Sequence, residues 1–185
     1  MKRIIIIVEG ITEERFVRKV LHPHFINLGI HLEPEQWITN RKTGDSGGGS
    51  NFDLVENHIR RRISRYSKDS DTFLTTMIDL YAFPLGGRTV YDDEVKAATR
   101  GVNRKYLLEK KMSERFNFYR FIPYVQLYEF ESLLYSDILK LATFYPDKNN
   151  EILELSSHVA GLNPEDINDR RETSPSHRII KFIPF

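Results

Sequence analysis

The stretch KRIIIIVEGITEERF, residues 2–16, decides the fold that this sequence predicts. Residues 3–8 form an almost continuous β-branched run, which is typical of a strand buried on both faces of a parallel sheet. Glu9 follows the run directly, Gly10 permits a tight turn, and Thr12 is a good N-cap for a helix whose first turn is acidic. The opening therefore predicts a strand that ends on a carboxylate and leads straight into a helix.

Strands and helices alternate from this opening onward. Such alternation predicts an α/β fold with a central, mostly parallel sheet flanked by helices. We expect one domain over 1–185, with an α/β core over 1–135 and a helical C-terminal extension over 136–185. The further elements expected are strands over 35–39, 71–81 and 118–130, the last divided by Pro123, and helices near 54–66, 91–116 (broken at Gly101, recapped by Asn103), 131–145, 148–160 and at the start of the tail.

Composition narrows the classes of function. The chain has 185 residues and no cysteine, which excludes disulfides, thiolate zinc sites and a cysteine nucleophile. The apolar run at 4–8 is too short for a signal peptide or a membrane span, so we expect a cytoplasmic protein without a membrane partner. Because the net charge is only +1, nucleic-acid binding requires a local basic patch.

Acidic residues follow three of the predicted strands. They are Glu9, Asp79, and the pair Glu129 and Glu131. Since active sites of open α/β sheets lie at the carboxyl ends of the strands, parallel strands would bring these carboxylates to one edge. A hard divalent cation is the usual solution to their repulsion, and Mg²⁺ prefers carboxylate oxygens. Each acid taken alone has the simpler interpretation of a solvated loop residue or a helix cap.

The geometry of Glu129 and Glu131 depends on where the fourth strand ends. In an extended segment, residues two apart lie on the same face and both acids would reach one cation. If a helix begins at Glu129 instead, they diverge by about 200°.

Two segments resemble Toprim domains, the topoisomerase–primase fold. IIVEGITEERF (6–16) is similar to the first motif, in which a strand delivers a glutamate followed by glycine, and TTMIDLY (75–81) is similar to the second, in which a strand delivers an aspartate. The resemblance implies that Glu9 is a general acid or base or a metal ligand. It implies Asp79 as a further ligand, and Glu13, four residues after Glu9, as in Toprim nucleases of the OLD type (overcoming lysogenisation defect).

A closer resemblance spans nearly the whole chain, to a family of small bacterial Toprim-like proteins of unknown function. It rests on VEGITEERFVRKVL (8–21), TMIDLYAFP (76–84), IPYVQLYEFESLLYSD (122–137) and SPSHRI (174–179). It implies an ATPase encoded nearby and a role in phage defence. Members of this family usually continue further, so a truncated or partly ordered C-terminus is expected at Phe185.

One position departs from the Toprim pattern. The second motif is normally Asp-x-Asp, but Tyr81 stands in place of the second aspartate. A metal would then need another ligand, which the resemblance assigns to Glu129 and Glu131.

Basic residues are candidates for binding nucleic-acid phosphates. The candidates are Arg41 and Lys42 beside a glycine-rich loop, Arg61 and Arg65 on a basic helix, and His177 and Arg178 in the tail. For the helix, an ordinary solvated face is the simpler interpretation, and His177 has the alternative of capping a helix. The glycine-rich loop lacks the Gly-Lys-Ser/Thr of a P-loop, so nucleotide hydrolysis is not predicted.

The leading hypothesis is a Mg²⁺- or Mn²⁺-dependent nuclease with Glu9 and Asp79 as catalytic residues. The metal ligands would be Glu9, Glu13, Asp79, Glu129 and Glu131, and the partners DNA or RNA, an ATPase and a further copy of the chain. The alternative is a non-catalytic Toprim-like module that binds nucleic acid or a partner ATPase. A third hypothesis is primase-like nucleotidyl transfer.

Overall fold

A computed structural model describes most of the chain, namely residues 1–37, 51–164, 167 and 173–183. The chain divides into a first unit, Met1–Gln126, and a second unit, Leu127–Phe185, each with its own packed interior. The change of structure thus comes at 126, nine residues before the boundary expected at 135.

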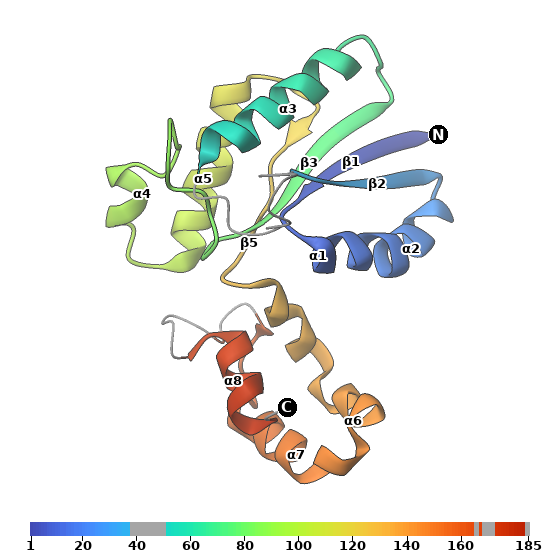
Figure 1. Ribbon diagram of the computed structural model, residues 1–185, viewed down its shortest axis with the longest axis vertical. Helices are drawn as coiled ribbons and strands as arrows, with labels where there is room; N and C mark the ends of the chain where they lie inside the picture. Colours follow the sequence, from blue (N-terminus) through green and yellow to red (C-terminus); the bar gives the residue numbers. More distant parts are fainter. Residues whose placement is uncertain (38–50, 165–166, 168–172, 184–185) are drawn as a thin grey trace, which may run out of the picture. The chain divides into compact units, whose positions relative to one another are not determined.

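The first unit is built on a parallel sheet (Figure 1). The strand order is β2-β1-β3-β4, with β5 also paired to β3, and every pair is parallel. The expected α/β fold with a mostly parallel central sheet is therefore confirmed. The strands are β1 (Lys2–Val8), β2 (Ile30–Gln36), β3 (Thr72–Asp79), β4 (Phe121–Ile122) and β5 (Val125–Gln126).

Helices cover both faces of this sheet. In Figure 1 the helices that follow β1 lie on one side of it, and the longer ones lie on the other. In chain order they are α1 (Ile11–Phe16), the π-helical η1 (Val17–Leu21), α2 (His22–Ile26), α3 (Phe52–Tyr66), α4 (Asp93–Ala97) and α5 (Gly101–Phe116). The break expected in 91–116 is confirmed, but α5 begins at Gly101 with Arg100 as its N-cap, so Asn103 does not recap it.

The strand β1 is buried on both faces, as its sequence predicts. Ile5 and Ile7 have no exposed surface, while Ile6 and Val8 pack in a cluster with Val17 of η1. Because alternate side chains of a strand point to opposite faces, this burial requires a helical layer on each side.

Two local predictions near the start of the chain were wrong. Thr12 is not the N-cap of α1, because the chain turns already at Gly10, whose backbone N–H donates to Glu13 Oε2 at 2.9 Å. The second strand lies earlier than 35–39: β2 ends at Gln36, and 38–39 lie outside the described residues. Pro34 argues against a strand in sequence. Among the described strands, however, β2 pairs only with β1 and so lies at an edge, where a missing N–H is tolerated.

Pro123 divides the last strand of the sheet, as expected. It separates β4 from β5, and Thr76 of β3 bridges the interruption. The Thr76 hydroxyl donates to the Tyr124 carbonyl at 2.8 Å, and the Tyr124 N–H donates back to it at 3.0 Å. The hydroxyl thus replaces ladder hydrogen bonds that the proline prevents.

A buried carboxylate ties α3 to α5. Glu56 is only 2% exposed, and it accepts from Arg60 at 2.7 Å and from Arg115 at 2.7 Å. Burial raises the pKa of Glu56, but the hydrogen bonds and charges of Arg115 and Arg60 outweigh it, so the pKa lies below its usual value. The carboxylate is therefore ionised and paired at neutral pH.

A buried arginine holds the last turn of α3. Arg120, 4% exposed, donates from Nη2 to the carbonyls of Tyr66 at 3.0 Å and Ser67 at 2.9 Å. Its guanidinium lies 4.8 Å from the ring centres of both Phe118 and Tyr119. A cation at a helix C-terminus is favourable because it complements the helix dipole.

The second unit is helical around its own hydrophobic cluster. Tyr135, Ile152, Leu155 and Ile179 belong to that cluster. Its elements are the 3₁₀ segment η2 (Phe130–Lys140, interrupted at Asp137), α6 (Leu141–Phe144), the 3₁₀ turn η3 (Pro146–Lys148), α7 (Asn149–His158) and α8 (Pro175–Phe182). Within the described part of the chain, no helix has the length and apolar character needed to cross a membrane.

Candidate functional site

Glu9 and Asp79 leave the sheet at the same edge, on neighbouring strands. β1 and β3 are parallel and pair in register up to Val8 with Met77. Glu9 is the first residue after β1, and Asp79 is the last residue of β3. β1 and β3 are neighbours, so the two acids follow the ends of strands that lie about 4.8 Å apart. Both acids are partly buried.

Two amides flank these acids along the carboxyl edge of the sheet. β2 ends on Gln36, which pairs with Val8, and β5 ends on Gln126, which pairs with Asp79. In strand order the edge therefore carries Gln36, Glu9, Asp79 and Gln126. We call this set the strand-end row. Sequence reasoning missed both glutamines, because it placed the second strand too late and extended the fourth strand to 130.

Gln36 is held by the first helix. Its amide and the Arg18 guanidinium both donate to the carboxylate of Glu14, the latter at 2.9 Å. The hydrogen bond from Arg18, followed by that from Gln36, lowers the pKa of Glu14. Glu14 thus orients one end of the strand-end row while it stays ionised.

The Glu13 carboxylate stabilises the start of its own helix. Its Oε2 accepts the backbone N–H of Gly10, the N-cap of α1. Among the residues that the structure describes, no group of three or more His, Asp or Glu side chains is arranged to hold a metal ion. The expected ligand set that joined Glu13 to Glu9 and Asp79 is therefore not seen as a formed cluster.

The residues present still suit a magnesium-type cation. Mg²⁺ keeps several waters and is commonly bound through one or two carboxylates together with substrate phosphates. Glu9 and Asp79, two carboxylates on adjacent strand ends, provide that number of charged oxygen donors. Binding of a metal ion by these two side chains stays a prediction.

Glu129 caps a helix in the second unit. Its Oε2 accepts from the backbone N–H of Ser176 at 3.1 Å and from the Ser176 hydroxyl at 2.8 Å. Glu131 lies in the first turn of η2, and Glu129 is the extended N-cap residue before it. The extended segment therefore does not continue to Glu131, and the two acids do not share one face of a strand. Ligation of a metal by either residue stays a prediction.

Replacing Glu129 by Ala is expected to lower the free energy of unfolding of the second unit by about 2 kcal/mol, because hydrogen bonds to a charged acceptor contribute about that much. Amide hydrogen exchange at the start of α8 measures it. Glu154→Ala, on an exposed position of α7, is the control and should change stability by less than about 0.5 kcal/mol. Unchanged exchange in Glu129→Ala would contradict the capping role.

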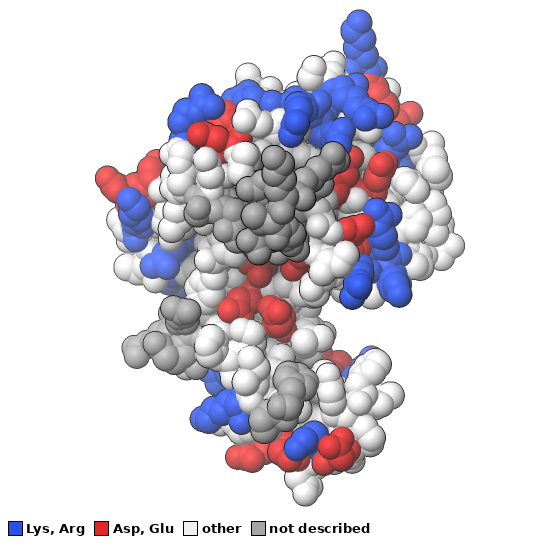
Figure 2. Space-filling view, viewed as in Figure 1, with Lys and Arg blue, Asp and Glu red and all other residues white. Residues whose placement is uncertain are grey.

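The basic candidates on α3 lie away from the strand-end row. Arg61 and Arg65 are exposed on the second half of α3. That half lies at the amino edge of the sheet, where Arg3 of β1 approaches the Tyr66 ring at 6.0 Å. Figure 2 shows Lys and Arg side chains gathered along the upper edge of this unit, where Figure 1 places the end of α3. Arg41 and Lys42 lie outside the described residues.

The basic candidates of the tail make local contacts. His177 Nδ1 lies 2.9 Å from the hydroxyl of Ser174, the N-cap of α8, and Arg178 donates to the Thr173 carbonyl at 2.8 Å. The N-cap of α8 is Ser174, and His177 lies in the first turn beside it. Phosphate binding by His177 and Arg178 stays a prediction.

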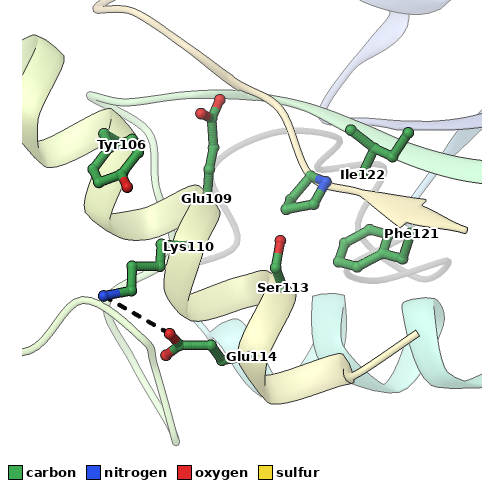
Figure 3. A pocket seen from close by; sticks show the side chains of 8 residues that line it. Tyr106, Glu109, Lys110, Ser113, Glu114, Phe121 and Ile122 are labelled. Atoms are coloured by element: carbon green, nitrogen blue, oxygen red, sulfur yellow. Dashed lines mark ion pairs between the residues drawn. The ribbon is translucent and has the colours of Figure 1, made fainter. Parts of the chain in front are cut away.

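A groove of about 440 Å³ lies between α5 and β4 (Figure 3). Its walls include Tyr106 and the Lys110–Glu114 ion pair from α5, facing Ile122 and Pro123. Among the candidate acids and basic residues that the structure describes, none lines this groove.

Comparison with known proteins gives one family. The family described as "Domain of unknown function (DUF4276)" matches residues 8–185 and so covers nearly all of both units. No curated protein and no protein of solved structure matches the chain. The relationship to Toprim domains stays a prediction from the sequence motifs.

Proposed function

The chain belongs to the DUF4276 family, and from its strand-end geometry we propose that it is a divalent-metal-dependent phosphodiesterase acting on nucleic acid, of the Toprim nuclease type. One observation carries the proposal: Glu9 and Asp79 follow the carboxyl ends of adjacent parallel strands. That edge is where open α/β sheets bind their ligands. The motif resemblance extends the proposal to phage defence with an ATPase partner.

In this proposal Glu9 and Asp79 hold Mg²⁺ or Mn²⁺. A bound divalent cation would neutralise the scissile phosphate and lower the pKa of an attacking water. Glu9, the first residue beyond its strand, would exchange a proton with that water. Asp79 is the last residue of β3, so the strand fixes its backbone, and its carboxylate would hold the cation in a constant position.

The chain's other groups would orient the site and the substrate. Glu13 fixes the turn that carries Glu9, because it binds the N–H of Gly10. Arg61 and Arg65 lie at the opposite edge of the sheet, so they would contact flanking phosphates and not the scissile one. Such contacts strengthen binding without reading sequence.

A non-catalytic binding module is the second candidate. It is favoured by the lack of a formed group of three metal-binding side chains among the described residues, and by Tyr81 in place of the second motif aspartate. In that case the strand-end row would have no catalytic role, and the basic end of α3 would bind the nucleic acid.

Plasmid nicking by the wild-type chain tests the proposal. Supercoiled DNA and a single-stranded RNA are each incubated with the protein and Mg²⁺ or Mn²⁺, with excess chelator as the control. We expect cleavage that requires the metal and is abolished by chelation. Calorimetry should show Mn²⁺ binding that Asp79→Asn removes. Absence of both cleavage and binding at millimolar metal would establish the binding module instead.

A further inference from the structure

The end of α3 presents a set of exposed cations, Arg61, Arg65 and Lys68, which we call the basic stripe. The three residues follow one another at intervals of four and three, so they lie along one side of the helix and of the turn after it. Arg61 donates through Nε to the Asn57 carbonyl at 3.2 Å, and the Arg65 guanidinium lies 5.5 Å from the centre of the Tyr66 ring. Neither contact neutralises the charge of its arginine.

The acids at this edge of the sheet do not cancel the charge of the basic stripe. Asp71 makes an ion pair with Lys2 at 2.6 Å, and Asp69 accepts from the Thr72 hydroxyl at 2.7 Å. Arg3, exposed near the start of β1, adds a further cation. Figure 2 shows the resulting excess of Lys and Arg side chains along this edge.

An exposed aromatic side chain stands at the end of the basic stripe. Tyr119 lies in the loop from α5 to β4 and is 79% exposed. Its hydroxyl accepts a hydrogen bond from Nη1 of Arg120, and Nη2 of the same guanidinium donates to the carbonyls of Tyr66 and Ser67. Arg120 therefore places Tyr119 beside the residue that precedes Lys68.

The ring of Tyr119 is held in place although most of it is in solvent. The Arg120 guanidinium lies 4.8 Å from the centre of the ring, and the Phe118 ring centre lies 5.8 Å away at an angle of 50°. A lone exposed tyrosine is ordinary. Cations beside an exposed aromatic ring, however, are the combination by which proteins bind single-stranded nucleic acid, because the cations contact the backbone and the ring stacks on a base.

We propose that the basic stripe and Tyr119 form a binding surface for single-stranded nucleic acid, in which the cations bind phosphates and the Tyr119 ring stacks on a base. The inference rests on the function proposed above, because it names the class of nucleic acid that the chain takes. Bases of a duplex are paired and stacked on one another, so a protruding ring reaches their faces in a single strand. The surface lies at the amino edge of the sheet, so binding there does not require the metal.

Fluorescence anisotropy in excess chelator tests the contribution of the ring. The probes are labelled oligomers of deoxythymidine and of uridine, about 20 nucleotides long to exceed one binding site, and a DNA duplex of the same length. Tyr119→Ala is expected to weaken binding of the tighter single strand about tenfold, within the usual effect of losing one base–aromatic stack, and to leave duplex binding within about twofold. Tyr119→Phe, which keeps the ring, should bind nearly as the wild type does.

Tyr106→Ala is the matched control for the ring. Tyr106 is 66% exposed on α5 but lines the groove between α5 and β4, so its loss should leave the affinity for each probe unchanged. An equal loss of single-strand and duplex binding in Tyr119→Ala, or no loss at all, would overturn the inference. So would a wild-type chain that binds none of the probes.

The salt dependence of binding tests the basic stripe. Arg65→Ala should reduce the slope of log K against log salt concentration by about 0.7 for a single strand, because one phosphate contact is lost. Lys19→Ala, an exposed position of η1 on the other side of the sheet, should leave the slope unchanged (Figure 1). An unchanged slope in Arg65→Ala would refute the phosphate contacts. Displacement of the single strand by poly-glutamate, with wild-type affinity in Tyr119→Ala, would assign the surface to an acidic protein segment instead.

Cleavage assays separate this inference from the proposed function. Binding in chelator that depends on Tyr119, together with no cleavage in Mg²⁺ or Mn²⁺, would uphold the surface and overturn the nuclease. Metal-dependent cleavage by a Tyr119→Ala protein that also binds single strands as the wild type does would uphold the nuclease and overturn the surface.

Discussion

Asp79→Asn is expected to reduce metal-dependent nucleic-acid cleavage by roughly 10³-fold or more, since loss of about 4 kcal/mol of transition-state charge stabilisation corresponds to that factor. Glu9→Gln should have an effect of the same order. Both changes keep side-chain size and remove one negative charge from adjacent strand ends. Because repulsion between Glu9 and Asp79 is relieved, thermal stability should stay the same or rise slightly. Initial rates of plasmid nicking at saturating Mn²⁺ measure the effect.

Asp71→Asn is the matched control for this pair. Asp71 precedes β3 at its amino end and makes an exposed ion pair with Lys2 at 2.6 Å. Its replacement should leave the nicking rate within about twofold of wild type, because exposed pairs contribute little. Cleavage that persists undiminished in both Asp79→Asn and Glu9→Gln would remove Glu9 and Asp79 from the mechanism.

Glu56→Gln is expected to lower the free energy of unfolding by about 3 kcal/mol at pH 7, because it breaks a buried ion pair and leaves two arginines without their carboxylate. For a chain of this length the melting temperature should fall by roughly 6–12 °C. Glu56 is the common partner of Arg60 and Arg115, so a single substitution removes both the ion pair within α3 and the one that joins α3 to α5. Denaturant unfolding monitored by circular dichroism gives the difference.

The effect of Glu56 should depend on pH in a definite direction. The pKa of Glu56 is lowered in the folded chain, so its stabilisation is complete above the unfolded-state pKa of about 4.3. It is lost as the pH falls through the folded-state pKa. The stability difference between wild type and Glu56→Gln should therefore be constant from pH 6 to pH 8 and shrink below about pH 4.

Glu114→Gln is the control for Glu56. Glu114 also lies on α5, but its pair with Lys110 is exposed and 3.9 Å long. We expect a change of less than about 0.5 kcal/mol, independent of pH over the same range. A Glu56→Gln protein as stable as the wild type at pH 7 would show that the buried pair does not hold the two helices together.

The sequence predicts best those elements whose structure depends on the residues of the element itself. The isoleucine run of β1, the alternating burial of β3 and the proline gap between β4 and β5 depend on local pattern alone. The position of β2 was wrong because a proline argues against a strand unless one knows that it lies at an edge. The N-cap of α1 was wrong because Glu13 reaches back to Gly10, which makes the earlier turn stable.

The candidate site was predictable only in part, for a similar reason. Parallel strands bring their ends to one edge, so Glu9 and Asp79 follow from the fold class. The bond from Ser176 to Glu129 joins residues 47 apart in sequence, and no local pattern reveals such a contact. Gln126 was missed because an uncharged amide at a strand end carries no signal until the register shows which residue lies beside it.

Glu56 and Arg120 make two attachments of α3 that respond differently to acid. The ion pair with α5 needs an ionised Glu56. The Arg120 guanidinium, which donates to the Tyr66 and Ser67 carbonyls, stays charged throughout the acidic and neutral pH range. On acidification, α3 is therefore expected to lose its ion pair with α5 before it loses the bonds from Arg120 to its last turn. The contacts between this turn and the aromatic segment from Phe118 to Phe121 should therefore persist to lower pH than the ion pair between α3 and α5.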